Sequence, residues 1–237
     1  MAPPAASRAL LLMGLVATLT ACDTAGDPDP VEDPTATYEV LFTATWSAQT
    51  HPTEFPANAH FSPLVGAVHN DDVSLWAVGR AASIGIQRMA ERGRTDSLAA
   101  EAAREPGTFR VLVDSAALST GYPSPSPPGQ AVRFGFAADH EHPLVTLVTM
   151  VAPSPDWFIG VSGFDLRPNG QWVDAVTVPL VVYDAGTDSG QTYTAPDEPT
   201  VPRGVVHVSD HPYFLTGGQP GGEPTLVGVF QFIRVGE

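Results

Sequence analysis

The chain has 237 residues, of which 43% are hydrophobic, so we expect one compact domain with a substantial core. Its formal net charge is −15, and all 11 basic residues are arginine. The sequence has no basic stripe that could displace phosphate counterions, which excludes nucleic acid as an expected partner. The acidic surface also disfavours direct attraction to anionic lipid, although a bound divalent cation would change that balance locally.

The first 21 residues have the pattern of a secretion signal. Arg8 is followed by an apolar run over residues 9–19, which is too short to span a bilayer stably. The next residues, Leu19-Thr20-Ala21-Cys22, resemble the bacterial lipobox, in which the cysteine is acylated before cleavage. Residues 1–21 are therefore predicted to be a signal peptide and Cys22 a lipidation site. The alternative is an ordinary signal peptide followed by a chance cysteine.

Residues 22–37 are predicted to be the lipidated cysteine and a disordered tether. They are rich in Pro, Asp, Gly and Thr and offer almost nothing to bury. Fully extended, the residues after Cys22 would span about 50 Å. Cys22 is also the only cysteine of the chain, so no internal disulfide is possible. We expect the folded domain to occupy residues 38–237, beginning near Tyr38.

The folded part has the pattern of an all-β protein. Residues 38–46 are rich in β-formers and predict a strand, whereas helical spacing occurs only within residues 74–103, with Gly93 as the expected stop. Further strands are predicted at 108–113, 132–136, 144–150, 158–163, 172–183, 205–208 and 226–235. Short strands separated by Pro and Gly turns predict an antiparallel β-sandwich with one or two short helices.

Asp156, Asp184 and Asp188 lie in two turn-rich segments, each of which closes a run of apolar residues. We expect these loops to lie at one end of the sheet, where a hard cation such as Ca²⁺ could bind carboxylate, carbonyl and water oxygens. Gly186 would let its loop turn back, so that the carboxylates on either side of it face one point. No His or Cys occurs within the two segments, which disfavours zinc. From the spacing alone, aspartates that cap turns explain the pattern equally well.

Templates for catalysis fail in this sequence. Asp188-Ser189-Gly190 matches the aspartic-protease triplet, but that mechanism needs two triplets and the chain has one. The same residues resemble the surroundings of a serine-protease nucleophile, but Thr187 replaces the expected glycine and no histidine has a matching context. We therefore predict that the protein is not an enzyme. The alternative is an envelope hydrolase that uses Ser189 or a histidine-bound metal.

The histidines are the remaining candidates for chemistry. They are His51, His60, His69, His140, His142, His207 and His211. No two pairs of them share a recognised ligand spacing, so we expect structural or solvated side chains.

Several motifs occur in order along almost the whole chain after the tether. They are Phe42-Thr43-Ala44-Thr45-Trp46-Ser47, Thr50-His51-Pro52, Phe55-Pro56, Ala59-His60-Phe61-Ser62-Pro63, Leu75-Trp76, Ala82-Ser83-Ile84-Gly85, Pro153-Ser154-Pro155-Asp156-Trp157, Gly170-Gln171-Trp172-Val173 and Asp184-Ala185-Gly186-Thr187-Asp188-Ser189-Gly190. Together these motifs resemble the spondin domain of F-spondin and its relatives, in register from about Tyr38 to Val235.

The resemblance implies an antiparallel β-sandwich similar to C2 domains, with one calcium ion held at loops by Asp156, Asp184 and Asp188. It also implies a non-catalytic role in adhesion or recognition. Animal relatives usually carry additional domains and cysteines before the Gly-x-Trp-Val motif, whereas this chain has Leu166-Arg167-Pro168-Asn169-Gly170 there. The binding partners of those relatives therefore cannot be carried over.

We expect a calcium-binding recognition or adhesion module of the bacterial cell envelope, at the outer membrane or the cell surface. Its link to the membrane would be the lipid on Cys22. Its ligand could be a protein, a glycan or a lipid, and the sequence does not distinguish among them.

Overall fold

Strand β1 (Thr35–Ala44) is central to the first of two antiparallel sheets in the computed structural model, which describes residues 34–114, 118–119 and 131–236. The order of this sheet, sheet 1, is β6-β1-β12-β9, with β6 at Ala131–Asp139, β12 at Gly228–Val235 and β9 at Ala175–Leu180. The predicted signal peptide, Cys22, most of the tether and the Pro- and Ser-rich segment at residues 121–129 lie outside the described residues.

Alternation of buried and exposed residues explains how β1 sits in sheet 1. Tyr38, Val40 and Phe42 are buried at every second position, as expected for a strand with one face on the core. β1 begins at Thr35, three residues before the predicted start at Tyr38. The difference arises because the first three residues pair with β6 and the third also pairs with β12, which adds ladder hydrogen bonds that composition does not reveal.

Sheet 2 faces sheet 1 and is built around β7 (Leu144–Ala152) and β8 (Trp157–Asp165). Its strand order is β11-β10-β8-β7-β2-β5, and β3 pairs with both β4 and β7. The bounds are β2 His60–Phe61, β3 Val65–His69, β4 Thr108–Val113, β5 Leu118–Ser119, β10 Tyr183–Asp184 and β11 His207–Val208. Almost every residue of β7 is buried, because both faces of this sheet are covered.

The predicted strand 172–183 is in fact two strands in different sheets. β9 pairs with β12 of sheet 1, whereas β10 pairs with β8 of sheet 2. Leu180 ends β9, and the chain then crosses between the sheets before β10 begins at Tyr183. This crossing matters for the site below because it delivers Asp184 to the end of sheet 2.

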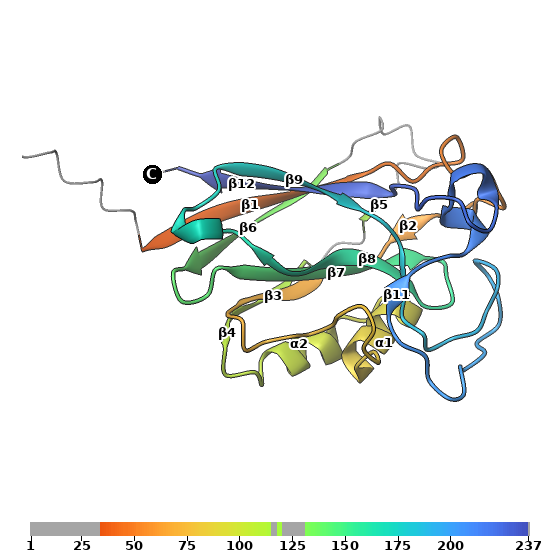
Figure 1. Cartoon of the computed structure of the whole chain (residues 1–237), viewed down its shortest axis with the longest axis horizontal. Helices are drawn as coiled ribbons and strands as arrows, with labels where there is room; N and C mark the ends of the chain where they lie inside the picture. Colours follow the sequence, from red (N-terminus) through yellow and green to blue (C-terminus); the bar gives the residue numbers. More distant parts are fainter. Residues whose placement is uncertain (1–33, 115–117, 120–130, 237) are drawn as a thin grey trace, which may run out of the picture. The chain divides into compact units, whose positions relative to one another are not determined.

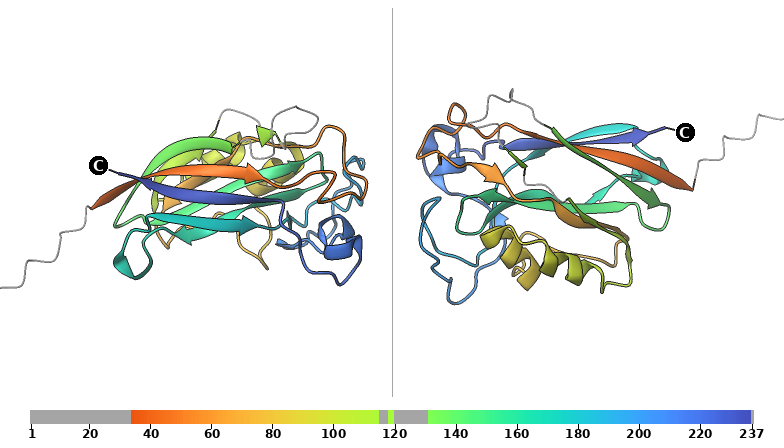
Figure 2. Two further views of the ribbon diagram at one scale, coloured as in Figure 1. Left: turned by 90° about the horizontal axis from the view of Figure 1, so that it is seen from above. Right: turned by 180° about the vertical axis from the view of Figure 1, so that it is seen from behind.

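Two short helices form a third layer on the outer face of sheet 2 (Figures 1 and 2). Helix α1 (Ile84–Arg92) is capped by the Ser83 side chain, which accepts a hydrogen bond from the Ile86 N–H. It ends at Gly93, which has a φ of 62° and confirms the predicted stop. Helix α2 is Asp96–Ala102. In the described part of the chain, 3₁₀ turns lie at Pro168–Gly170, Pro212–Phe214 and Thr216–Gly218.

The core lies between the two sheets and is rich in aromatic side chains. Phe42 of β1 packs edge-to-face on Phe61 and Phe230, with ring centroids 5.0 and 5.5 Å apart. A second buried cluster joins the helices to sheet 2. The prediction of an all-β, antiparallel sandwich with short helices is confirmed. Among the described residues, none of the helices has the length and apolarity needed to cross a bilayer.

Candidate metal site

The pairing of β8 with β10 brings the aspartate loops together. Asp156 lies directly before β8, and Asp184 ends β10. Asp184 pairs with Trp157, the first residue of β8, so the two acidic residues lie at the same end of sheet 2. The expectation that these loops are neighbours is therefore met in the structure.

Asp156 is fully buried, and its two carboxylate oxygens differ in their surroundings. Oδ2 accepts hydrogen bonds from the Thr187 N–H at 2.7 Å, the Thr187 hydroxyl at 3.2 Å and the Asp188 N–H at 3.1 Å. Oδ1 is buried without a hydrogen-bond partner among the described residues. Burial, followed by the negative charge of Asp184, raises the pKa of Asp156 to about 7. A buried oxygen of this kind favours a proton or a bound cation.

Asp184 is closer to solvent, with 22% of its side chain exposed. Its Oδ1 accepts a hydrogen bond from the Gly186 N–H at 2.7 Å, and the Trp157 side chain also hydrogen-bonds the carboxylate. His207 Nδ1 lies 4.0 Å from the same oxygen. Burial raises the pKa of Asp184, while these polar neighbours act in the opposite direction. Asp184 and Asp156 thus form a pair of crowded carboxylates.

Asp188 uses both of its oxygens to hold the loop. Oδ1 accepts a hydrogen bond from the Gly190 N–H at 2.8 Å, and Oδ2 accepts one from the Glu198 N–H at 2.9 Å. This is the turn-capping role that the sequence left open. Among the described residues, no three His, Cys, Asp or Glu side chains are gathered closely enough to form a complete metal-binding group.

Gly186 allows the loop to approach its neighbour. Its φ is 70°, and a Cβ at this position would lie 2.8 Å from the backbone carbon of Gly204 and the nitrogen of Val205. Only glycine fits this close contact between backbones. The contact holds the aspartate loop against residues 204–205, as the Gly204 N–H donates to the Gly186 carbonyl at 2.9 Å.

A pocket of about 410 Å³ opens beside the aspartates. Its lining includes Asp184, Asp188, His207 and Asp210. Sequence spacing did not connect the last two residues with the aspartate loops. The pairing of β10 with β11 does so, because it sets Asp184 opposite His207. Two-residue strands have no periodicity that a sequence could reveal.

Three of the histidines are structural, as predicted. His51 lies between the hydroxyls of Thr50 and Thr225, at 2.9 and 2.8 Å. His69 contacts the Asn70 carbonyl and the Thr146 hydroxyl. His211 contacts the Gln191 carbonyl through Nε2, and its Nδ1 accepts from the Tyr213 N–H. Both ring nitrogens of each histidine are thus engaged.

Ser189, the nucleophile of the alternative hydrolase, has no histidine within hydrogen-bonding distance among the described residues. Its hydroxyl pairs with the Thr200 hydroxyl at 2.9 Å, and its N–H donates to the Glu198 carbonyl at 2.7 Å. A serine nucleophile needs an adjacent general base, which this arrangement does not supply.

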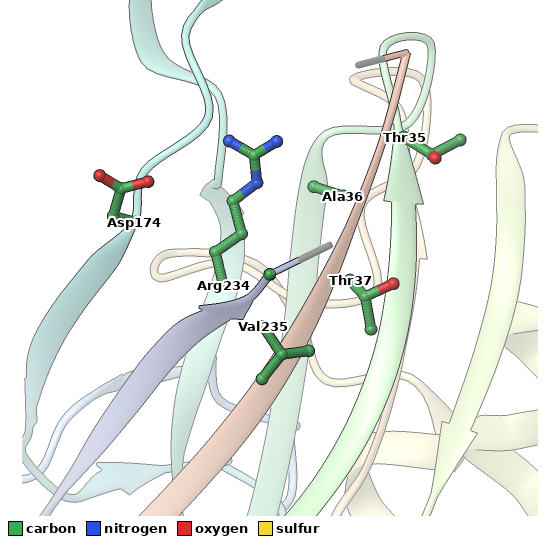
Figure 3. Close-up of a pocket in the computed structure, with 7 residues that line it drawn as sticks. Thr35, Ala36, Thr37, Asp174, Arg234 and Val235 are labelled. Carbon is green, nitrogen blue, oxygen red and sulfur yellow. The ribbon is translucent and has the colours of Figure 1, made fainter. Parts of the chain in front are cut away.

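A different pocket, of about 430 Å³, lies at the ends of β1 and β12 (Figure 3). Asp174 and Arg234 line it together with small side chains from residues 35–37. It contains one carboxylate only, so it is a poorer cation site than the aspartate loops.

Comparison with known proteins identifies similar sequences. The sequence model of the Spondin_N family matches residues 36–213. Spondin-1 of Gallus gallus is 34% identical over 198 residues, which cover 81% of this chain and 25% of the relative. Spondin-2 of Rattus norvegicus is 35% identical over 176 residues, covering 73% and 52% respectively. Human Spondin-2 is also 35% identical, over 174 residues. The matched region thus spans about a quarter of Spondin-1 and half of Spondin-2.

Proposed function

The chain belongs to the Spondin_N family, and we propose that it is a calcium-binding, non-catalytic recognition or adhesion module of the bacterial cell envelope. The family match, over residues 36–213, covers both aspartate loops and most of the sandwich, whereas β12 lies beyond it. Recognition rather than catalysis is favoured because Ser189 lacks a base and its loop is held by Thr200 and Glu198.

The observation that carries the calcium proposal is the Oδ1 of Asp156, which is buried without a hydrogen-bond partner among the described residues and lies near a second carboxylate, that of Asp184. Two crowded carboxylates repel each other, and a hard divalent cation would neutralise both. Asp156 and Asp184 would hold one Ca²⁺, and Asp188 would complete the set through a rearrangement of its loop, because both of its oxygens otherwise accept loop amides. Backbone carbonyls and water would be the further oxygen ligands. The ion would supply positive charge and loop order.

The anchoring proposal rests on the sequence alone. Cys22 follows an apolar run of signal-peptide length and precedes a Pro- and Asp-rich segment. Several acyl chains on Cys22 would attach the domain firmly to a membrane, and the segment would act as its tether. Mass spectrometry of the mature protein tests this directly, because an acylated N-terminal Cys22 has a characteristic mass.

Calorimetric titration of the metal-stripped domain with CaCl₂ tests the ion site. We expect stoichiometric binding of one ion, abolished by Asp184→Ala and retained by Asp174→Ala. Asp174 is a suitable control because it is an exposed aspartate in the other pocket. Calcium binding would be refuted by two results together. The unmodified domain would give no heat of calcium binding, and Asp184→Ala would leave thermal stability unchanged with and without Ca²⁺.

A pull-down from envelope extracts tests the recognition role. The purified domain would be used in Ca²⁺, in chelator and as the Asp184→Ala variant. We expect a protein or glycan partner retained only by the calcium-loaded, unmodified domain. If the partner is retained equally in all three samples, recognition does not depend on Ca²⁺.

A further inference from the structure

Two segments beside the aspartate loops carry exposed apolar side chains. In residues 77–84, Val78 is 57% exposed and Ile84 is 48% exposed. In residues 200–206, Val201 is 88% exposed and Val205 is 46% exposed. Half of the eight large hydrophobic side chains exposed in the described part of the chain are therefore in these two short segments.

Backbone hydrogen bonds hold the two segments side by side. The Gly79 N–H donates to the Val206 carbonyl at 2.8 Å, and the Val206 N–H donates to the Arg80 carbonyl at 2.8 Å. The Arg203 guanidinium also reaches the Ala82 carbonyl, at 3.5 Å, and donates to the Gln87 side chain of α1. We call this surface the loop patch. It consists of Val78, Arg80, Ile84, Val201, Arg203 and Val205.

The charge of the loop patch is opposite to that of the chain. Arg80 and Arg203 are both exposed, and neither residues 77–84 nor residues 200–206 contain an acidic side chain. The chain as a whole has 26 acidic residues and a net charge of −15. A cationic, aliphatic surface on such a protein is complementary to an anionic partner.

The patch is also continuous with the candidate cation site. Thr200, Gly204 and Val205 line the pocket that contains Asp184 and Asp188. The Gly186 carbonyl accepts a hydrogen bond from the Gly204 N–H at 2.9 Å. An ion bound to these aspartates would therefore add positive charge at the border of the patch.

We propose that the loop patch docks on an anionic lipid surface, with its valine and isoleucine side chains entering the headgroup region and its arginines contacting phosphates. Small aliphatic groups flanked by arginine suit an interface between hydrocarbon and charged headgroups. The patch has none of the aromatic side chains that usually anchor protein–protein interfaces. This inference relies on the envelope location in the proposed function.

Vesicle flotation of the domain comprising residues 33–237 tests the proposal, since this segment is one compact unit with its own core. The probes are vesicles of phosphatidylcholine alone and vesicles that also contain phosphatidylglycerol. We expect binding only to the anionic vesicles, weakened by salt. Arg80→Gln should reduce binding about five-fold, the effect of one arginine near an anionic surface. Val201→Ser should also reduce it.

Matched controls are Arg110→Gln and Leu226→Ser, which remove an exposed arginine and an exposed leucine outside the patch. Both should bind vesicles as the unmodified domain does. No binding to either vesicle, or binding that Arg80→Gln and Val201→Ser leave unchanged, would overturn the proposal.

Failure of the lipid proposal is distinguishable from failure of the calcium proposal. The calorimetric titration of Val201→Ser should give the same calcium heat as the unmodified domain, whichever vesicle result is obtained. If vesicle binding instead depends on the patch but persists in chelator and in Asp184→Ala, lipid docking stands without the ion.

Discussion

At the scale of single residues, Asp156 offers a test in which one substitution has opposite effects in two conditions. In chelator, Asp156→Asn removes a buried charge, and its amide oxygen can still accept the hydrogen bonds from Thr187 and Asp188. We expect the ion-free variant to be as stable as the unmodified domain, or more stable by about 1 kcal/mol. In saturating Ca²⁺ the variant should lack the stabilisation that the ion gives.

Thermal unfolding with and without Ca²⁺ measures both effects. At a Ca²⁺ concentration of about 100 times Kd, binding stabilises by about 2.7 kcal/mol, which corresponds to a Tm increase of about 5–10 °C for a domain of this size. We expect this increase in the unmodified domain and not in Asp156→Asn. An equal loss of Tm in chelator and in Ca²⁺ would show that Asp156 has a packing role only.

His51 makes a second prediction at this scale, on the pH dependence of stability. Burial lowers the pKa of His51 to about 4, and the neutral ring lies between two threonine hydroxyls. Between pH 6.5 and 4 the unfolded chain binds a proton that the folded state does not, so folding stability falls as pH falls. The loss reaches about 3 kcal/mol.

Urea unfolding at pH 7 and at pH 4.5 checks this dependence. His51→Gln removes the titrating ring, so the variant should lose less stability than the unmodified domain on acidification. The gap in unfolding free energy between the two proteins should therefore shrink at pH 4.5. A gap of constant size would exclude His51 as a source of acid sensitivity. Burial also lowers the pKa of His69, so part of the slope should remain.

At the scale of elements, the contact between the two helices depends on one carboxylate. Glu101 of α2 accepts hydrogen bonds from the Ser83 hydroxyl at 2.6 Å and from the Gly85 N–H at 2.7 Å. It thus satisfies a free donor at the start of α1 and places a negative charge at the positive end of that helix. Glu101→Ala should destabilise the domain by about 1–3 kcal/mol.

Chemical denaturation measures this loss, and Glu105→Ala is its matched control. Glu105 is an exposed glutamate just beyond α2, so its removal should change the unfolding free energy by less than about 0.5 kcal/mol. Glu101→Gln should lie between the two because it keeps the hydrogen-bond acceptor without the charge. If Glu101→Ala behaves like the control, the helices are held by their apolar contacts alone.

Elements with a strong local signal were predictable from the sequence. Strand β4 occupies the predicted residues 108–113, and Gly93 ends α1 as expected. The local sequence pattern was not sufficient where the structure of a segment depends on the strand with which it pairs. Nothing in the apolar run 172–183 shows that it pairs first with β12 and then with β8, because both sheets offer the same apolar environment. Thr35 joins β1 only because β6 extends far enough to pair with it.

At the scale of the whole molecule, the sequence predicted only some of the residues of the candidate site. In the sequence, Asp156 and Asp184 each lie in a turn-rich segment that closes an apolar run, so their meeting at one end of a sheet could be expected. His207 and Asp210 reach the same pocket through β11, a strand too short to carry a pattern. The separate role of Asp188, whose carboxylate holds two loop amides, depends on where Glu198 lies and is invisible in spacing.

The sandwich is stabilised by its apolar core, whereas the aspartate loops are stabilised by polar contacts. This difference predicts which part of the domain calcium should stabilise. The aromatic core between the sheets is complete without the ion, since residues such as Phe42 and Phe230 are fully packed. The aspartate loop, in contrast, is held mainly by hydrogen bonds to carboxylates and carbonyls. Bound Ca²⁺ should therefore order the loops and leave sheet 1 unchanged.

Amide hydrogen exchange of the domain in Ca²⁺ and in chelator measures this division. We expect exchange to slow on calcium binding, about ten-fold or more, in residues 184–190 and 198–208, because local opening would then have to release the ion. Exchange in β1 and β12 should change little at temperatures well below the unfolding transition. Asp184→Ala should give the chelator pattern in both conditions. Equal slowing in β1 and in residues 184–190 would mean that the ion stabilises the fold only globally, without a distinct effect on the loops.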